Sequence, residues 1–296
     1  MALPTVMVLP MLIVVAAGIY YIYNEIIQYM SKSMVKNKVV VITDAVSGVG
    51  SGEDFIFLFP AKNKSINTFP PKLVLLDFSD MDSMPEVVNE VVECYGCVDI
   101  LVCNSSMKLK APVHTVSLEL DRNIMDINYF GPSTLAKGVL PVMMSRRSGH
   151  ILLVNSIQGR LAIPFRTSYS ASKHAVQAFF DCLRAEVEEY GIIVSTISHT
   201  FINAAVPSTP PAKPQGLPTC EYIHTILYIQ LSLSIGVRPA DLANEIMRTV
   251  SRKKKEVLLA HPIPRVALYL RSFFPSFFFA VVAAGVKDSA MAEQMQ

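Results

Sequence analysis

The chain has 296 residues, enough to bury one sizeable hydrophobic core and to form one or two domains. Apolar residues make up 51% and charged residues 17%, which is more apolar than an ordinary soluble domain. The net charge of +2 gives no support for a nucleic-acid partner, and five cysteines, an odd number in a long chain, do not indicate a disulfide framework.

The N-terminal end of the sequence is a long apolar segment. No charged residue occurs from Ala2 to Asn24, and a helix of this length crosses about 30 Å of hydrocarbon. A cleaved signal peptide is the alternative, but no basic region precedes the apolar run. Residues 1–24 are therefore predicted to be an uncleaved membrane anchor. By the positive-inside rule, the main domain is expected in the cytosol because three lysines follow: Lys32, Lys36 and Lys38.

The body of the chain alternates strand and helix patterns. Short β-branched or apolar runs predict buried parallel strands at residues 38–43, 72–77, 99–104, 150–155, 192–197 and 256–260. Helical patterns lie between them at residues 86–95, 118–144, 168–190 and 239–252. The second helical pattern is expected to break near Pro132. Such alternation predicts an α/β fold with a Rossmann-like, doubly wound parallel sheet.

A turn containing two glycines follows the first predicted strand. Glycines at this place let a helix N-terminus approach a pyrophosphate, whose charge the exposed N–H groups satisfy. Alone the signal is weak, because glycine turns after strands have many other uses. The candidate cofactor contacts in this turn are Thr43, Ser47, Gly48, Val49 and Gly50.

A tyrosine and a lysine four residues apart carry the main catalytic signal. In a helix this spacing places the Tyr169 phenol and the Lys173 ammonium on one face. We expect the ammonium to lower the pKa of the phenol from roughly 10, which makes Tyr169 a general acid/base for an alcohol or carbonyl oxygen. Ser156, just past a predicted strand, could hold the same oxygen, and Asn128 could hold a water and pass protons from Lys173.

These residues, in this order, resemble the short-chain dehydrogenase/reductase family over roughly residues 37–262. The resemblance implies a catalytic domain that binds NAD or NADP, with NAD slightly preferred. It implies that Tyr169 is the acid/base, that Lys173 also contacts the nicotinamide ribose and that Ser156 polarises the carbonyl. The implied catalytic residues are Asn128, Ser156, Tyr169 and Lys173, and the further implied cofactor contacts are Asp77 and Asn104.

Within this family the sequence is most similar to the reticulum-anchored member 7 group, in particular its muscle C form. Asp44 in place of glycine, residues 181–190 and the Phe-rich tail carry this likeness. The likeness implies retinoid or steroid alcohols and ketones as substrates, an endoplasmic or sarcoplasmic reticulum membrane, and pairing into a homodimer.

The sequence departs from the family between Gly50 and Lys72. Only 21 residues lie there, whereas the fold needs a helix, a strand and another helix, and each crossover takes at least about 10–12 residues. The run Phe55–Phe59 can supply one short element, so the second crossover is predicted to be shortened. No residue can be assigned to bind the adenosine ribose. The choice between NAD and NADP as cofactor therefore stays open. Asp44 should weaken pyrophosphate binding by like-charge repulsion unless it turns outward.

Other departures leave alternatives open. Ser105 and Ser106 replace the usual Ala-Gly, and His199 is either a new polar group in the site or an ordinary loop histidine. Residues 204–236 lie where the family has its substrate lid. They are apolar enough either to line an apolar substrate pocket or to pack on their own core. Residues 263–296 form an apolar tail that either packs on the domain or dips into the membrane.

Two cysteines and a basic run have simpler interpretations. Cys94 and Cys97 have redox spacing but follow a helical pattern rather than opening one, so they are predicted to be ordinary thiols. No metal site is expected. The run Arg252–Lys255 is either a solvated helix end or a contact with anionic lipid.

Two functions fit the sequence. The first is an NAD(P)-dependent oxidoreductase that interconverts a lipophilic alcohol and its aldehyde or ketone, favoured by the order and spacing of the four catalytic residue types. The second is a catalytically weak or inactive membrane protein of the same fold that binds a partner or lipid, favoured by the short segment between Gly50 and Lys72.

Overall fold

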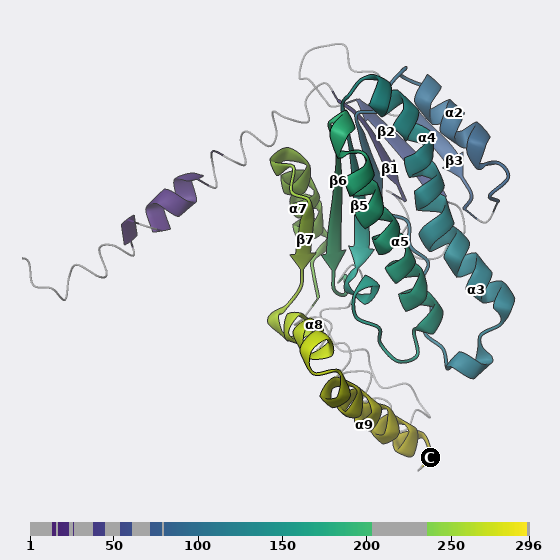
Figure 1. The fold of residues 1–296 in the computed structure, drawn as a ribbon, viewed down its shortest axis with the longest axis vertical. Coiled ribbons are helices and arrows are strands. Elements are labelled where there is room, and N and C mark those ends of the chain that lie inside the picture. The colour runs from purple at the N-terminus through teal and green to yellow at the C-terminus, as the bar shows by residue number, and fades with distance from the viewer. Residues whose placement is uncertain are drawn as a thin grey trace, which may run out of the picture.

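A sheet of seven strands forms the centre of the molecule (Figure 1). The computed structural model describes residues 14–15, 17–23, 26, 38–44, 54–60, 72–78, 80–202 and 236–294. The strands are β1 (Val39–Thr43), β2 (Asp54–Pro60), β3 (Lys72–Leu76), β4 (Ile100–Cys103), β5 (Gly149–Ser156), β6 (Ile192–His199) and β7 (Glu256–Leu259). Their order is β3-β2-β1-β4-β5-β6-β7, and β1, β4, β5, β6 and β7 pair in parallel. The six predicted strands and the doubly wound α/β class are confirmed.

β2, which was not among the six predicted strands, is an exception in an otherwise parallel sheet. β2 pairs antiparallel with both β1 and β3. A parallel connection needs a crossover of about a dozen or more residues, whereas antiparallel neighbours need only a turn. The connecting segments, residues 44–53 and 61–71, are both shorter than that. As a result β2 begins, rather than ends, at the carboxyl edge of β1 and β3, where Asp54 pairs with Leu76.

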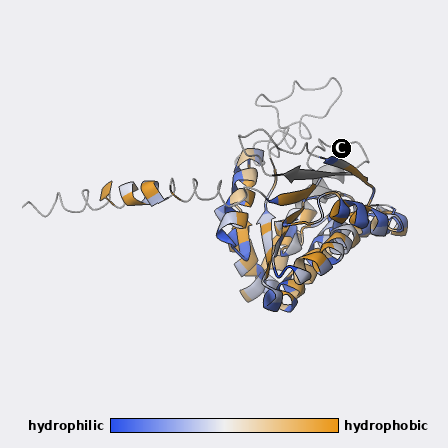
Figure 2. Cartoon of the chain, turned by 90° about the horizontal axis from the view of Figure 1, so that it is seen from above, coloured by the Kyte–Doolittle hydropathy of each residue, from blue (hydrophilic) through white to orange (hydrophobic). Residues whose placement is uncertain are grey.

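Helices cover both faces of the sheet (Figure 1). On one face α2 (Met84–Glu93), α4 (Gly131–Ser145) and α5 (Thr167–Glu186) pack on a large apolar cluster that includes the fully buried Phe180. On the other face α7 (Pro239–Arg252) packs through Leu242 on a second cluster. The helices carry both hydrophobic and hydrophilic residues, as helices between a sheet and solvent require (Figure 2). The four helical patterns are thus confirmed.

The predicted break before Pro132 takes the form of a π-helical segment. α3 (Leu118–Met125) is followed by a π-helix over Asp126–Phe130, and α4 then begins at Gly131 with Pro132 in its first turn. A π-helical turn holds more residues than an α-helical one and is frequent at functional sites. Here it carries Asn128, which is 1% exposed.

The C-terminal tail forms two helices that leave the body of the domain, α8 (Pro262–Phe273) and α9 (Pro275–Gln294) (Figure 1). Many of their large apolar side chains are exposed, including Tyr269, Phe273 and Phe277. Of the predicted N-terminal anchor, residues 14–15 and 17–23 are helical, and the rest lies outside the described residues. Within the described part of the chain, no helix is both long and apolar enough to span a bilayer.

Candidate active site

The ends of β1 and β4 are joined at the carboxyl edge of the sheet by the Thr43 hydroxyl. Its Oγ1 accepts hydrogen bonds from the backbone N–H groups of Asn104, at 2.9 Å, and Ser105, at 3.2 Å. The Asn104 side-chain amide in turn donates to the Asp44 carbonyl at 3.2 Å. Thr43 is 1% exposed, so this hydroxyl positions the turn after β4 from inside the protein.

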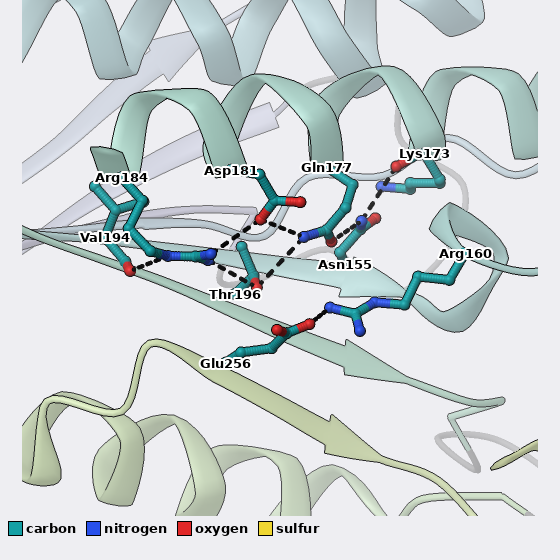
Figure 3. A network of polar contacts seen from close by, with 9 residues as sticks. All are labelled: Asn155, Arg160, Lys173, Gln177, Asp181, Arg184, Val194, Thr196 and Glu256. Atoms are coloured by element: carbon teal, nitrogen blue, oxygen red, sulfur yellow. Dashed lines mark hydrogen bonds and ion pairs between the residues drawn. The ribbon is translucent and has the colours of Figure 1, made fainter. Parts of the chain in front are cut away.

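A buried asparagine fixes α5 against β5 (Figure 3). The Asn155 side-chain N–H groups donate to the Lys173 carbonyl at 3.2 Å and to Gln177 Oε1 at 3.0 Å, and its Oδ1 accepts from the Ser156 N–H at 2.9 Å. Gly159 lies against the same contact, because a Cβ there would lie 2.6 Å from the Lys173 carbonyl oxygen. These contacts set the position of the helix that carries Tyr169. The sequence analysis missed Asn155, whose signal is a polar residue inside a buried strand.

The structure brings Ser156, Tyr169 and Lys173 together, as the sequence analysis expected. Tyr169 is 4% and Lys173 2% exposed, and Lys173 Nζ lies 5.8 Å from the centre of the tyrosine ring. The Ser156 hydroxyl lies close enough to the phenol of Tyr169 to lower its pKa. A substrate oxygen placed at this pair would meet two hydroxyl groups.

The pKa of Tyr169 differs from the expectation. Burial raises it above 10, and the nearby hydroxyls of Ser156 and Ser106 and the charge of Arg166 only partly offset this effect. The Arg166 guanidinium carbon lies 6.0 Å from the centre of the ring. The prediction that the Lys173 ammonium lowers this pKa in the folded chain is therefore wrong, and Arg166 is the cation that lowers it.

The pKa of Lys173 is itself shifted strongly from its ordinary value. Burial, together with the nearby positive charge of Lys108, lowers its pKa to about 7. The physical reason is that a fully buried ammonium loses its hydration, while the like charge adds repulsion. Near neutral pH this lysine can therefore gain or lose a proton.

Asn128 connects the loop after β4 to α5. Its Oδ1 accepts from the Met107 N–H at 2.8 Å, and its N–H groups donate to the Met107 carbonyl at 2.9 Å and to Ser172 Oγ at 3.0 Å. The Ser172 hydroxyl donates to the Tyr169 carbonyl at 2.8 Å. Asn128 therefore supports the backbone of the catalytic helix through one intermediate residue.

His199 ends β6 beside the site. Burial and the smaller effect of the Lys173 and Lys108 charges, partly offset by the hydrogen bond to Thr200, lower its pKa to about 4, so the imidazole is neutral at physiological pH. Its Nδ1 is hydrogen-bonded to the Thr200 carbonyl. His199 is thus a neutral polar group near Lys173 rather than a distant loop histidine.

Two further hydroxyls adjoin the site without having been assigned to it from the sequence. Within the described residues, Ser105 Oγ and Ser106 Oγ are buried and have no hydrogen-bond partner within normal distance and angle. Buried polar groups of this kind are uncommon, and at a site they are satisfied by ligands. Arg166, three residues before Tyr169, could have been found from helical spacing, whereas nothing in the sequence singles out Lys108.

Several predicted residues lie elsewhere or outside the described part of the chain. Asp77 is exposed directly after β3, at the same edge of the sheet. Ser47, Gly48, Val49 and Gly50, and residues 204–235 of the predicted lid, lie outside the described residues. Cys94 and Cys97 are free thiols, and no group of three His, Cys, Asp or Glu side chains in the described residues could hold a metal ion.

Comparison with known proteins agrees with this geometry. The family model for short chain dehydrogenases matches residues 63–212. Dehydrogenase/reductase SDR family member 7C-A of Danio rerio is 57% identical, and the alignment covers 100% of both chains. The chain belongs to the short-chain dehydrogenase/reductase family. A second relative in this family, member 7C of Homo sapiens, is 49% identical over 97% of each chain. These identities place the chain in the member 7C group.

Solved structures of the short-chain dehydrogenase/reductase fold agree. A short-chain dehydrogenase from Streptomyces avermitilis superposes with a TM-score of 0.54 at 21% identity, covering 75% of this chain and 80% of that one. The apo form of LigO from Sphingobium gives a TM-score of 0.52 at 22% identity, covering 75% of this chain and 76% of that one. At these identities the likeness supports the fold alone.

Proposed function

We propose that the chain is an NAD(P)-dependent oxidoreductase that interconverts a lipophilic, retinoid- or steroid-like alcohol and its aldehyde or ketone at a reticulum membrane. The observation that carries the proposal is the convergence of Ser156, Tyr169 and Lys173 at the carboxyl edge of the sheet, in a family of oxidoreductases.

The protonation states of the site assign roles to these side chains. In the direction of carbonyl reduction, the Tyr169 phenol donates its proton to the substrate oxygen, and the Ser156 hydroxyl donates a hydrogen bond to the same oxygen. A pKa of Tyr169 above 10 keeps the phenol protonated and ready to donate. Lys173, with a pKa of about 7, can return a proton to the phenol. Asn128, whose side-chain N–H groups both donate to protein acceptors, positions the catalytic helix through Ser172.

The described part of the edge suits an anionic dinucleotide. Lys108 and Lys173 give it positive charge, and the buried hydroxyls of Ser105 and Ser106 are available to a ligand. Asn104 and Asp77 line the same edge, and together with Thr43 and residues 47–50 they complete the proposed binding site. A bound nicotinamide cofactor supplies or accepts the hydride at the substrate carbon.

We propose NAD as the preferred cofactor, as the resemblance to the family implies, and separate titrations with NADH and NADPH test this preference.

Membrane attachment is part of the proposal. Residues 1–24 form the anchor, and the catalytic domain lies on the cytosolic side of the reticulum membrane as a homodimer. The exposed apolar side chains of α8 and α9 support a membrane-associated domain, because soluble monomers rarely expose so many together.

The second candidate, a binding protein with little or no catalysis, is favoured by β2. The antiparallel strand replaces the crossover that precedes β3 in the family, which alters the half of the sheet expected to hold the adenosine.

Cofactor binding separates the two functions directly. The full-length chain in detergent is titrated with NADH and NADPH while the fluorescence of each is recorded. The oxidoreductase proposal predicts saturable binding, and no saturation by either at millimolar concentration contradicts it.

A substitution then tests the role of the tyrosine. Tyr169→Phe should lower turnover of a lipophilic alcohol by roughly 10²–10⁴-fold, because the proton donor is lost, with cofactor affinity nearly unchanged. Tyr269→Phe, on the exposed surface of α8, is the matched control and should change neither quantity. Equal losses of turnover and cofactor affinity in Tyr169→Phe would mean that the phenol is structural.

A further inference from the structure

Two basic side chains lie at nearly the same distance from the ring of Tyr169. The guanidinium carbon of Arg166 lies 6.0 Å from the centre of the ring, and Lys173 Nζ lies 5.8 Å from it. Arg166 is the N-cap residue of α5, three residues before the tyrosine, and Lys173 follows the tyrosine by four residues. The motif Tyr-x-x-x-Lys contains only the second of these groups.

Hydrogen bonds fix the backbone on both sides of Arg166. The Phe165 carbonyl accepts from the Ala111 N–H at 2.8 Å, and the Arg166 carbonyl accepts from the Ser170 N–H at 2.8 Å. Phe165 has a φ of 63°, in the left-handed region that bulky residues rarely adopt. Strain of this kind persists where the surrounding structure enforces it, and it is frequent at active sites. The loop therefore holds Arg166 at the place from which its side chain reaches the ring.

The two basic groups differ in charge at the pH at which the phenol ionises. Burial and the charge of Lys108 lower the pKa of Lys173 to about 7, whereas the pKa of Tyr169 is raised above 10. Lys173 is therefore neutral when the phenol loses its proton, while a guanidinium stays charged. His199, with a pKa of about 4, is neutral as well. Among the described residues, no acidic side chain contributes to the pKa of Tyr169.

We propose that Arg166 is a positioning residue for alcohol oxidation, and that its guanidinium, rather than the Lys173 ammonium, stabilises the Tyr169 phenolate. The inference rests on the proposed function. In the oxidation step the O–H proton of the alcohol passes to the phenolate oxygen, and the hydride on the same carbon passes to the oxidised nicotinamide cofactor. A fixed cation beside the phenol keeps more of it ionised and ready to take that proton.

The ionisation of the phenol can be measured in the full-length chain in detergent, without cofactor or substrate. A ring-fluorinated tyrosine, which loses its proton at lower pH than tyrosine, replaces the tyrosines, and fluorine NMR spectra are recorded against pH. The Tyr169 signal is the one missing from Tyr169→Phe. Arg166→Met should raise its titration midpoint by about 0.5–2 pH units, the range for one charge 6.0 Å away at effective dielectric constants of about 80 and about 20.

Three further variants separate charge from packing. Arg166→Lys, which keeps a cation at this position, should recover most of the change. Lys173→Met, at nearly the same distance from the ring, should move the midpoint less than Arg166→Met, because the lysine that it removes is neutral at that pH. Arg252→Met, an exposed cation on α7, should leave the midpoint as it is. An unchanged midpoint in Arg166→Met, with circular dichroism showing a folded chain, or a larger change in Lys173→Met, overturns the proposal.

Kinetics connect the same charge to turnover. Below the pKa of the phenol, the ionised fraction falls about tenfold per pH unit, so Arg166→Met should slow alcohol oxidation by about 3–100-fold near pH 9. Arg166→Lys should restore most of the rate. Oxidation that Arg166→Met leaves unchanged would overturn the role of Arg166 and keep the oxidoreductase. A wild-type chain without turnover would reject the oxidoreductase, and the titration midpoint would still decide whether Arg166 acts on the phenol.

Discussion

Replacing the buried Lys173 by methionine should stabilise the fold near neutral pH. Methionine keeps the length and apolar stem of lysine but removes a cation that is 2% exposed. Burial lowers the pKa of Lys173 from 10.5 to about 7, so between these pH values the unfolded chain holds a proton that the folded chain does not. At about 1.4 kcal/mol per pH unit, the linked free energy of unfolding is on the order of 5 kcal/mol.

The sign of the effect follows from this difference in bound protons. Where the unfolded state binds more protons, stability rises with pH, so the wild-type chain gains stability from about pH 7 to 10.5 as the unfolded lysine loses its proton. Lys173→Met has no such dependence. Its stabilisation should therefore be largest at pH 7 and below, and should disappear towards pH 10.5.

Urea unfolding of the full-length chain in detergent, followed by circular dichroism at pH 7 and pH 10, measures both values. We expect a gain of about 2–5 kcal/mol at pH 7, below the full linkage value because relaxation and water penetration reduce the penalty. Lys137→Met, an exposed cation on α4, should change stability by less than about 1 kcal/mol at either pH. A gain in Lys173→Met that is the same at both pH values, or a loss at pH 7, would refute the reasoning.

Two further predictions concern packing and pH. Gly159→Ala should destabilise the fold by about 1–3 kcal/mol in urea unfolding, because its Cβ would lie 2.6 Å from the Lys173 carbonyl oxygen, and an unchanged midpoint would contradict this contact. Alcohol oxidation should accelerate as the pH rises towards 10 and beyond, since Tyr169 must lose its proton first, while carbonyl reduction should not. A rate of oxidation that is flat with pH would show that a different group takes the proton.

The sequence predicted the strands and helices, because each depends on a local pattern of apolar and polar residues. Each buried apolar run became a strand, and the four-residue spacing of Tyr169 and Lys173 placed both on one side of α5. The direction of β2 could not be read in the same way, because an apolar run such as Phe55–Phe59 has no polarity of its own. Only the lengths of the connecting segments indicate that it runs antiparallel.

The electrostatics of the site depended on burial, which spacing does not reveal. The four-residue spacing predicted that Lys173 would lower the pKa of Tyr169, yet desolvation raises the pKa of the phenol and lowers that of the ammonium. The cation that acts on Tyr169 is Arg166, and the one that acts on Lys173 is Lys108, which lies 65 positions away in the sequence. Contacts at such separations follow from the fold and not from a motif.

Two hydrogen bonds to the catalytic helix end on the backbone carbonyls of its two reactive residues. The Ser172 hydroxyl donates to the Tyr169 carbonyl, and Asn155 donates to the Lys173 carbonyl. Asn128 supports Ser172 from the π-helical segment, so both contacts are themselves fixed by buried side chains. A helix held in this way keeps its position while the phenol and the amine exchange protons, because protonation of either group breaks none of these bonds. The reactive groups and the residues that position them are therefore different side chains. For this reason the site needs buried amides that the Tyr-x-x-x-Lys pattern does not contain.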